Sequence, residues 1–276
     1  MAQDGRRRDG QGVGTMNARL ESAVGIIEEA MGLALRFFEA RDAIATRTKG
    51  SQDFVSEADT TVERLVRDRL AAAFPGETVL GEEMGGVADD AYWIIDPIDG
   101  TANFLRGSPL WGISLGFVRN GRPELGVVAM PVFKDVYAAA DGTGLIMNGK
   151  PLARHVPFKD VQVMSLGDSA AADAEEVAAL NVGLRHAGWV VESIRSTSIG
   201  LAFAARGIFD GHLQKLTTMW DIAGGVVLAR EAGLDVRIGT RPGSGVPWVA
   251  AATPALMAVT EGFWPEIMET ALAEPA

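Results

Sequence analysis

A hairpin pattern near the middle of the chain limits its fold most strongly. Residues 112–130 read as two strands on either side of the dipeptide Asn120-Gly121, and Asn-Gly is a strong signal for a tight turn between antiparallel strands. Two further short strands are predicted over residues 135–140 and 144–147. Helical patterns precede these strands, so the first half of the chain is predicted to be α+β.

Helices and strands are also predicted on both sides of the hairpin. Apolar residues recur at intervals of three and four over residues 20–41, and a second helical pattern begins at Ser56. Short strands over residues 78–80 and 92–95 follow. The second half alternates, with helices predicted over residues 170–187, 199–208, 221–232 and 254–273 and strands over residues 189–194 and 246–251.

The length of 276 residues is compatible with two domains or one large one. We expect residues 1–19, rich in Gly, Arg, Asp and Gln, to form a disordered tail, and residues 20–276 to form one folded unit. No internal repeat and no Pro/Ser-rich linker divides this unit. Its halves, about residues 20–150 and 151–276, are predicted to build a layered α/β fold with one site between them.

The acidic composition excludes several classes of protein. The 25 Lys and Arg residues against 36 Asp and Glu residues give a formal net charge of −11, which argues against binding of a nucleic-acid backbone through a basic stripe. The chain contains no cysteine, so disulfides, thiolate metal sites and cysteine nucleophiles are excluded. No run of 18 apolar residues and no signal-peptide pattern occurs. We therefore expect a cytoplasmic protein with neither a membrane nor a nucleic-acid partner.

Two short motifs match known patterns without the context that those patterns need. Residues 144–150 read GLIMNGK, but Pro151 stands where a Walker A loop carries Ser or Thr. Residues 112–116 read GISLG, but Ser114 alternates with apolar residues inside a strand rather than at a strand–turn–helix corner. The sequence therefore predicts neither a P-loop ATPase nor a serine hydrolase.

The segment WIIDPIDGTANF, residues 93–104, carries the strongest chemical signal. A strand delivers Asp96 to its carboxyl end, and a proline fixes the turn that leads to Asp99. Gly100 and Thr101 then allow a helix to begin, and its first backbone N–H groups are available to an anion. The alternative interpretation is an Asx turn with two solvated aspartates.

Further carboxylates lie at comparable positions along the chain. They are Asp59 at the start of a predicted helix, Glu82 and Glu83 after a predicted strand, and Asp221 at the start of another helix. Carboxylates without histidine or cysteine partners are ligands for Mg²⁺, Mn²⁺ or Ca²⁺ rather than for zinc or copper. Beside a helix N-terminus, such a cluster suits a phosphate group bridged to divalent metal ions.

These residues resemble a known family. WIIDPIDGTANF is similar to the WxxDPxDGTxNF signature of inositol monophosphatases, and WDIAGGVVLAREAG, residues 220–233, is similar to their second signature, WDxAAGxLxxxEAG. The GEE element at residues 81–83 and the DFVSEAD element at residues 53–59 also match. The resemblance extends from about Leu20 to the C-terminus, with both signatures in the order and spacing of the family.

The resemblance implies a fold and an activity. The fold is a five-layer αβαβα sandwich of the inositol monophosphatase/fructose-bisphosphatase type. The activity is that of a Mg²⁺-dependent, Li⁺-sensitive phosphomonoesterase, usually a homodimer, with two or three Mg²⁺ ions that Mn²⁺ can replace. The expected reaction is hydrolysis, by metal-activated water, of a small phosphorylated metabolite such as myo-inositol 1-phosphate or a related sugar or polyol phosphate.

The resemblance also assigns metal ligands. Glu82, Asp96 and the carbonyl oxygen of Ile98 resemble the ligands of the first metal ion. Asp96, Asp99 and Asp221 resemble those of the second, and a third, weaker ion would share Glu82. The residues expected to lie behind these ligands are Glu83 and Asp53.

Catalytic roles follow from the same resemblance. Thr101, paired with Asp59, resembles the hydroxyl–carboxylate couple that orients the attacking water, and Glu82 is expected to act with them. The backbone of Gly100 and Thr101 resembles the turn that binds the phosphate. These residues are therefore expected to surround the scissile phosphorus.

Two departures from the family pattern concern the substrate. The residues expected to bind it are Gly100, Thr101, Ser198, Ile199, Gly200, Gln214 and Asp221. Ser198 stands in the place of a glycine in the RxxGxA stretch of the family. Gln214 stands in the place of a glutamate that contacts sugar hydroxyls in inositol-specific members, which leaves recognition of inositol open.

The sequence is compatible with two alternative functions. Residues 103–111, NFLRGSPLW, are somewhat similar to the RGxPxW stretch of histidinol-phosphate phosphatases on the same scaffold. The other alternative is a non-catalytic regulatory binding protein in contact with nucleic-acid machinery. The complete set of Glu82, Asp96, Asp99, Thr101 and Asp221 favours catalysis over this alternative.

Overall fold

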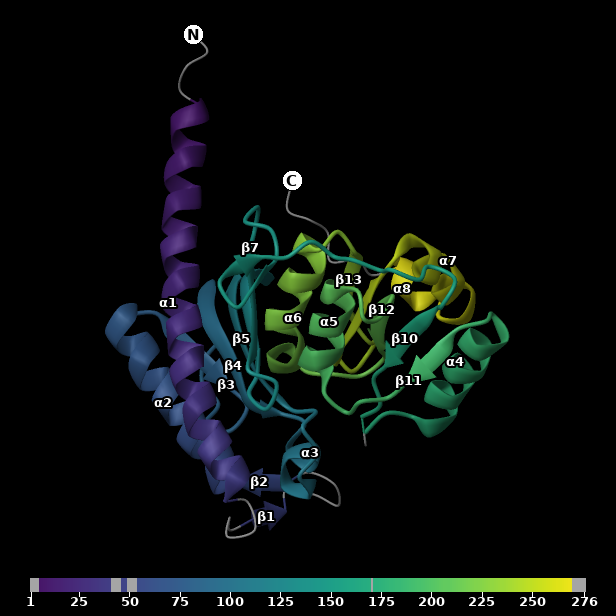
Figure 1. Cartoon of the computed structure of the whole chain (residues 1–276), viewed down its shortest axis with the longest axis horizontal. Coiled ribbons are helices and arrows are strands. Elements are labelled where there is room, and N and C mark those ends of the chain that lie inside the picture. Colours follow the sequence, from purple (N-terminus) through teal and green to yellow (C-terminus); the bar gives the residue numbers. More distant parts are fainter. Residues whose placement is uncertain (1–4, 41–45, 49–53, 170, 270–276) are drawn as a thin grey trace.

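The structure, a computed structural model, describes residues 5–40, 46–48, 54–169 and 171–269. Two sheets and three layers of helices alternate in it (Figure 1). The outer layer of the first half consists of helices α1 (Gly5–Glu39) and α2 (Glu57–Ala73). The layer between the two sheets consists of α5 (Thr197–Arg206) and α6 (Met219–Glu231). The outer layer of the second half consists of α4 (Ala174–His186), α7 (Pro254–Phe263) and α8 (Glu266–Glu269). This is the layered α/β arrangement that the sequence predicts.

The first sheet has seven strands in the order of the sequence. They are β3 (Thr78–Gly81), β4 (Ala91–Asp99), β5 (Gly112–Arg119), β6 (Arg122–Met130), β7 (Asp135–Ala140), β8 (Ile146–Met147) and β9 (Lys150–Pro151). Strands β3 and β4 are parallel, and all later neighbours are antiparallel. Asn120 and Gly121 both have positive φ, at 50° and 78°, which confirms the predicted tight turn between β5 and β6.

The second sheet has five strands in the order β11-β10-β12-β14-β13. They are β10 (Val163–Leu166), β11 (Val190–Glu192), β12 (Gly211–Gln214), β13 (Asp235–Thr240) and β14 (Pro247–Ala252). Strand β10 is parallel to both of its neighbours, whereas β14 is antiparallel to both of its own. A small antiparallel pair, β1 (Thr46–Thr48) and β2 (Phe54–Ser56), and the short helix α3 (Thr101–Arg106) complete the fold.

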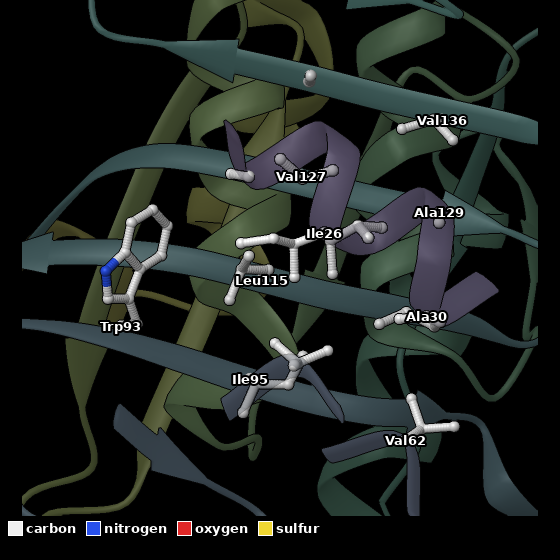
Figure 2. Packing of buried hydrophobic residues seen from close by; sticks show 14 of the residues in the cluster. Ile26, Ala30, Val62, Trp93, Ile95, Leu115, Val127, Ala129 and Val136 are labelled. Carbon is white, nitrogen blue, oxygen red and sulfur yellow. The ribbon is translucent and has the colours of Figure 1, made fainter. Parts of the chain in front are cut away.

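The outer face of the first sheet packs on α1 and α2. Ile26 and Ala30 of α1 lie against Leu115 and Val127 of the sheet, and all four belong to one buried apolar cluster (Figure 2). Burying a large aliphatic side chain of this kind stabilises the fold by roughly 1.5–3 kcal/mol. This core fixes the strands at whose ends the predicted carboxylates lie.

Glycines bring α6 close to the inner face of the same sheet. A Cβ atom on Gly126 would lie 2.0 Å from the carbonyl oxygen of Gly224, and one on Gly224 would lie 2.9 Å from the Ser114 hydroxyl. No larger side chain fits between these backbones. The close approach brings the first turn of α6, which carries Asp221, against β4.

The N-terminal helix begins earlier than the sequence suggests. We expected a disordered tail through residue 19, but α1 starts at Gly5, and Arg19 donates two hydrogen bonds to Glu77, at 2.6 and 2.7 Å. Once a helix is nucleated, each added residue gains one hydrogen bond, so a polar segment can extend it. Despite its length, α1 is not a candidate membrane span, and none is found elsewhere in the described residues.

Other differences arise from short or interrupted elements. Strands β10, β12 and β13, of four to six residues, were not predicted, although strands of similar length were predicted elsewhere. The helix predicted over residues 254–273 is interrupted within the described part at Trp264, where φ is −140° and ψ is 72°. Pro265 follows, and the residue before a proline is disfavoured in helical conformation.

Candidate active site

The parallel pair β3 and β4 places two predicted ligands at one sheet edge. Gly81 lies opposite Ile95 in the register, and the next backbone N–H, that of Glu82, donates to the Ile95 carbonyl oxygen at 3.3 Å. Asp96 is the next residue of β4. Glu82 and Asp96 therefore lie side by side, where the parallel pairing of β3 and β4 ends.

The turn after Asp96 departs from regular strand geometry. The register of β4 against β5 shifts between Asp96 and Asp99. The Asp96 carboxylate accepts a hydrogen bond from the Ile98 N–H at 3.0 Å, and the Thr101 hydroxyl donates to the Ile98 carbonyl oxygen at 3.1 Å. Gly100 has a φ of 93° and caps α3. A side chain there would be strained and would press on the carbonyl oxygens of two neighbouring segments.

Asp221 reaches this turn from α6. A capping box orients its carboxylate, which accepts hydrogen bonds from the Thr217 hydroxyl at 3.0 Å and the Thr218 N–H at 3.3 Å. Carboxylate oxygens of Asp96, Asp99 and Asp221 all lie within 4.8 Å of one another. The structure thus brings together three of the predicted metal ligands from two separate elements.

Asp99 is held from the second half of the chain. Its Oδ2 atom accepts hydrogen bonds from the Ser196 hydroxyl at 2.7 Å, the Ser198 N–H at 2.6 Å and the Ser198 hydroxyl at 2.5 Å. Both serines lie at the start of α5. The acidic cluster therefore depends on contacts between β4, α5 and α6.

Burial raises the pKa of each of these carboxyl groups, and repulsion between the carboxylates raises those of Asp96 and Asp221 further. The pKa of Asp96 is raised well above its ordinary value, first by burial and then by the negative charges of Glu82, Asp99, Asp221 and Asp59. Burial and the charge of Asp99 raise the pKa of Asp221 to about 7. Burial also raises the pKa of Asp99, although its serine hydrogen bonds oppose the rise. A bound cation would relieve this repulsion.

The donor set fits a hard divalent cation. The charged neighbours that raise the pKa of Asp96 are all carboxylates, so the site offers negatively charged oxygen atoms as metal ligands. Oxygen-only sets of this kind suit Mg²⁺, Mn²⁺ or Ca²⁺. Asp96, Asp99 and Asp221 would hold such an ion, and Glu82 and the Ile98 carbonyl oxygen lie at the same edge of the sheet.

Thr101 and Asp59 lie at this site without the pairing that we expected. Asp59, in the first turn of α2, is buried and its charge acts on Asp96. The Thr101 hydroxyl has one proton, and it is directed to the Ile98 carbonyl oxygen rather than to Asp59. Asp53 lies outside the described residues. Glu83 contributes its backbone N–H to a contact with Glu63, a residue of α2 that the sequence did not single out.

The substrate residues expected in α5 and β12 are buried. Ser198 contacts Asp99, Ile199 packs in an apolar cluster between the sheets, and Gly200 lies against the ring of His212. Gln214 is only 6% exposed. Its oxygen accepts from the Thr197 hydroxyl at 2.8 Å, and its nitrogen donates to the Leu216 carbonyl oxygen at 2.9 Å. Ile199 thus packs in the core, and the amide of Gln214 makes hydrogen bonds within the protein.

The residues that hydrogen-bond to Asp221 and Asp99 were not identified from the sequence. The sequence carries a signal for the first of these contacts. Thr218, three residues before Asp221 at a helix start, has the spacing of a capping box. The contacts of Ser196 and Ser198 with Asp99 span almost a hundred residues. No local pattern encodes such a pairing.

Comparisons with known proteins agree with this geometry. A model of the inositol monophosphatase family matches residues 16–261. A Mycobacterium leprae protein named inositol-1-monophosphatase is 35% identical, covering 79% of this chain and 82% of its own length. A Pseudomonas aeruginosa protein named Nus factor SuhB is 31% identical, covering 79% and 84%.

Solved structures show the same fold. The structure of a Thermotoga maritima IMPase superposes with a TM-score of 0.75 at 24% identity, and the match covers 91% of this chain and 98% of the other. The family model spans the sheet edge, the turn at residues 96–101 and the first turn of α6. This chain therefore belongs to the inositol monophosphatase family and is a phosphoric monoester hydrolase.

Proposed function

We propose that this enzyme is a Mg²⁺-dependent phosphatase of small sugar or polyol phosphates, with myo-inositol 1-phosphate as the first candidate substrate. The observation that carries the proposal is the cluster of the buried Asp96 and Asp99 with the partly buried Asp221, whose carboxylate oxygens lie within 4.8 Å of one another. The name of the Mycobacterium leprae relative supports the choice of inositol 1-phosphate. Mn²⁺ is proposed as a substitute for Mg²⁺.

The residues of the site have distinct proposed roles. Asp96, Asp99 and Asp221 would hold the ions, together with Glu82 and the Ile98 carbonyl oxygen. When bound, the ions would lower the pKa of the attacking water and neutralise charge on the phosphate and the leaving oxygen.

Other residues act on the water and the phosphate. Asp59, buried beside Asp96, and Thr101 are proposed to orient the attacking water. The backbone N–H groups of Gly100 and Thr101 are proposed to bind phosphate oxygens. Gly100 has a left-handed conformation at the start of α3, and successive N–H groups in such a turn can form a concave anion site. Attack then occurs in line with the leaving alkoxide, without a covalent intermediate on the enzyme.

The nature of the alcohol is the part of this proposal that needs a direct assay. Histidinol phosphate is the alternative substrate, because residues 103–111 resemble the corresponding phosphatases. The values of kcat/KM should be compared, in Mg²⁺, for myo-inositol 1-phosphate, histidinol phosphate, fructose 1,6-bisphosphate and a 3′-phosphonucleotide. We expect myo-inositol 1-phosphate to have the highest value. A higher value for histidinol phosphate would establish the alternative instead.

Three further properties remain predictions. The family resemblance predicts a homodimer and inhibition by Li⁺. The composition of the chain predicts a cytoplasmic location. Light scattering of the purified chain measures its mass and tests the dimer. The net charge of −11 does not favour binding of a nucleic-acid backbone, so no nucleic-acid partner is proposed.

A further inference from the structure

A buried carboxylate lies directly beneath the turn that carries Glu82. The turn runs from Gly81 to Gly85, and two backbone hydrogen bonds between these glycines, at 2.9 and 3.1 Å, close it. Glu63 of α2 has no exposed surface and lies against this turn. Glu63 is not one of the proposed metal ligands, and a carboxylate is not needed to fill the apolar core, so its place beneath the turn needs another explanation.

Glu63 accepts hydrogen bonds from the backbone of the turn. Its Oε2 atom accepts from the Glu83 N–H at 2.8 Å, and its Oε1 atom accepts from the Met84 N–H at 3.1 Å. Oε1 also accepts from the Nε atom of Arg67 at 2.8 Å, one helical turn further along α2. All three partners are donors, so both oxygens of the Glu63 carboxylate act as acceptors in this pocket.

Arg67 connects the same carboxylate to both ends of the turn. One terminal nitrogen of its guanidinium donates to the Val79 carbonyl oxygen at 3.0 Å, before the turn, and the other donates to the carbonyl oxygen of Gly85, at its end. The planar guanidinium can make these bonds only in one orientation. Glu63 and Arg67 together therefore fix the start, the middle and the end of the turn.

Gly81 allows the Glu63 carboxylate to lie directly against the turn. A Cβ atom on Gly81 would lie 2.2 Å from Oε1 and 2.8 Å from Oε2 of Glu63. A side chain at position 81 would displace the carboxylate. The absence of a side chain at position 81 is therefore what allows the carboxylate to approach the backbone of the turn.

On its other side the turn faces the acidic cluster. The Glu82 N–H donates to the Ile95 carbonyl oxygen, and the charge of Glu82 contributes to the raised pKa of Asp96. A shift of the turn relative to α2 would therefore move Glu82 relative to Asp96. We propose that Glu63 and Arg67 are positioning residues that hold Glu82 at the metal site. This inference rests on the proposed metal-dependent function.

Two pairs of variants test the inference. Glu63→Gln replaces one acceptor oxygen by an amide that faces N–H donors, and Arg67→Lys removes the planar fork. The controls are Glu29→Gln and Arg69→Lys, which alter an exposed ion pair between α1 and α2 with contacts of 2.6 and 2.7 Å. Exposed pairs of this kind contribute little to stability.

Each full-length protein is stripped of metal and titrated with Mn²⁺ by electron paramagnetic resonance, and the Mg²⁺ concentration for half-maximal activity is measured separately. We expect Mn²⁺ binding at least about tenfold weaker in Glu63→Gln and Arg67→Lys, in the range found when partners of metal ligands are removed. The Mg²⁺ requirement should rise in parallel, with activity partly restored at high Mg²⁺. Both controls should match the wild type.

The result that overturns the inference is a folded Glu63→Gln protein with a lower melting temperature but wild-type Mn²⁺ affinity. If Glu63→Gln does not fold, Arg67→Lys decides, because it keeps the charge beside Glu63, and wild-type affinity in that variant overturns the inference as well. A wild-type protein that binds no Mn²⁺ would refute the proposed function itself. The two failures are therefore distinguishable.

Discussion

Asp99 accepts two hydrogen bonds from the single residue Ser198, one from the backbone N–H at 2.6 Å and one from the hydroxyl at 2.5 Å. Asp99 ends a strand of the first sheet, and Ser198 lies in the first turn of α5, which packs on the second sheet. The orientation of this predicted metal ligand is thus set by the other half of the chain. The pair couples assembly of the two halves to assembly of the acidic cluster.

Removing the hydroxyl should weaken this coupling. For Ser198→Ala we expect a loss of about 1.5–3 kcal/mol in the free energy of unfolding, because a hydrogen bond to a charged group contributes roughly that amount. Urea unfolding in Mg²⁺ measures it. Ser22→Ala is the control, since that hydroxyl bonds only to an exposed backbone oxygen. Equal losses in the two variants would show that Ser198 does not support Asp99.

Removing the charge of Asp99 should have a different effect. Asp99→Asn keeps an oxygen that accepts from Ser196 and Ser198, and it lowers repulsion in the metal-free cluster, so folding should survive. The rate should fall at least about a hundredfold, equivalent to roughly 2.7 kcal/mol, because a metal ligand is weakened. Steady-state kinetics and a melting curve check both statements. Near wild-type turnover would reduce Asp99 to a turn residue.

The buried position of Gln214 makes a glutamate there unfavourable. Gln214→Glu replaces the N–H group that donates to the Leu216 carbonyl oxygen by a second acceptor, in a side chain that is 6% exposed. We expect a loss of about 1–3 kcal/mol at pH 8 from the unsatisfied group. The loss should be smaller at pH 5, where a protonated glutamate can donate. A variant of wild-type stability that binds myo-inositol 1-phosphate more tightly would place this side chain in the substrate pocket instead.

Metal binding should stabilise the protein more as the pH rises. The pKa of Asp221 is raised to about 7 by burial and Asp99, whereas an unfolded aspartate titrates near about 3.9. Between these values the metal-free native state holds the extra proton, so its stability falls as the pH rises through about 7. A bound cation removes this penalty. We therefore predict a larger Mg²⁺-induced rise in melting temperature at pH 8 than at pH 5.

A comparison with and without Mg²⁺ at each pH isolates this effect. Burial lowers the pKa of His212 to about 4, which costs stability as the pH falls and so opposes the trend of Asp221. The His212 contribution is present with and without metal, and it cancels in the difference. A Mg²⁺-induced shift that does not change with pH would contradict the raised pKa of the cluster.

The sequence was most informative where one short segment determines the structure. The Asn120-Gly121 hairpin and the turn from Asp96 to Thr101 follow from local rules on turns, strands and helix starts. The meeting of Asp96, Asp99 and Asp221 followed from the family resemblance, and the structure brings these residues together. The burial of Asp96 and Asp99 could not be read from the sequence, because it depends on the packing of α5 and α6 against the sheet.

Contacts between distant segments could not be predicted in the same way. Glu63 looks like an ordinary polar residue of an amphipathic helix, and only the close approach of Gly81 makes it a buried contact. Gln214 was assigned to the substrate from the family resemblance, and its hydrogen bonds to Thr197 and Leu216 could not be read from the sequence. Short strands such as β10 become strands through their neighbours on both sides.

The most direct measurement is phosphate release from myo-inositol 1-phosphate by the metal-stripped full-length protein, before and after addition of Mg²⁺. We predict no activity in EDTA, recovery with Mg²⁺ or Mn²⁺, and inhibition by excess Ca²⁺, which prefers more ligands at longer distances. Asp96→Asn should not recover, because Asp96 is the ligand expected to be shared by both ions. Full activity in EDTA would contradict the metal-dependent mechanism, as would undiminished activity in Asp96→Asn.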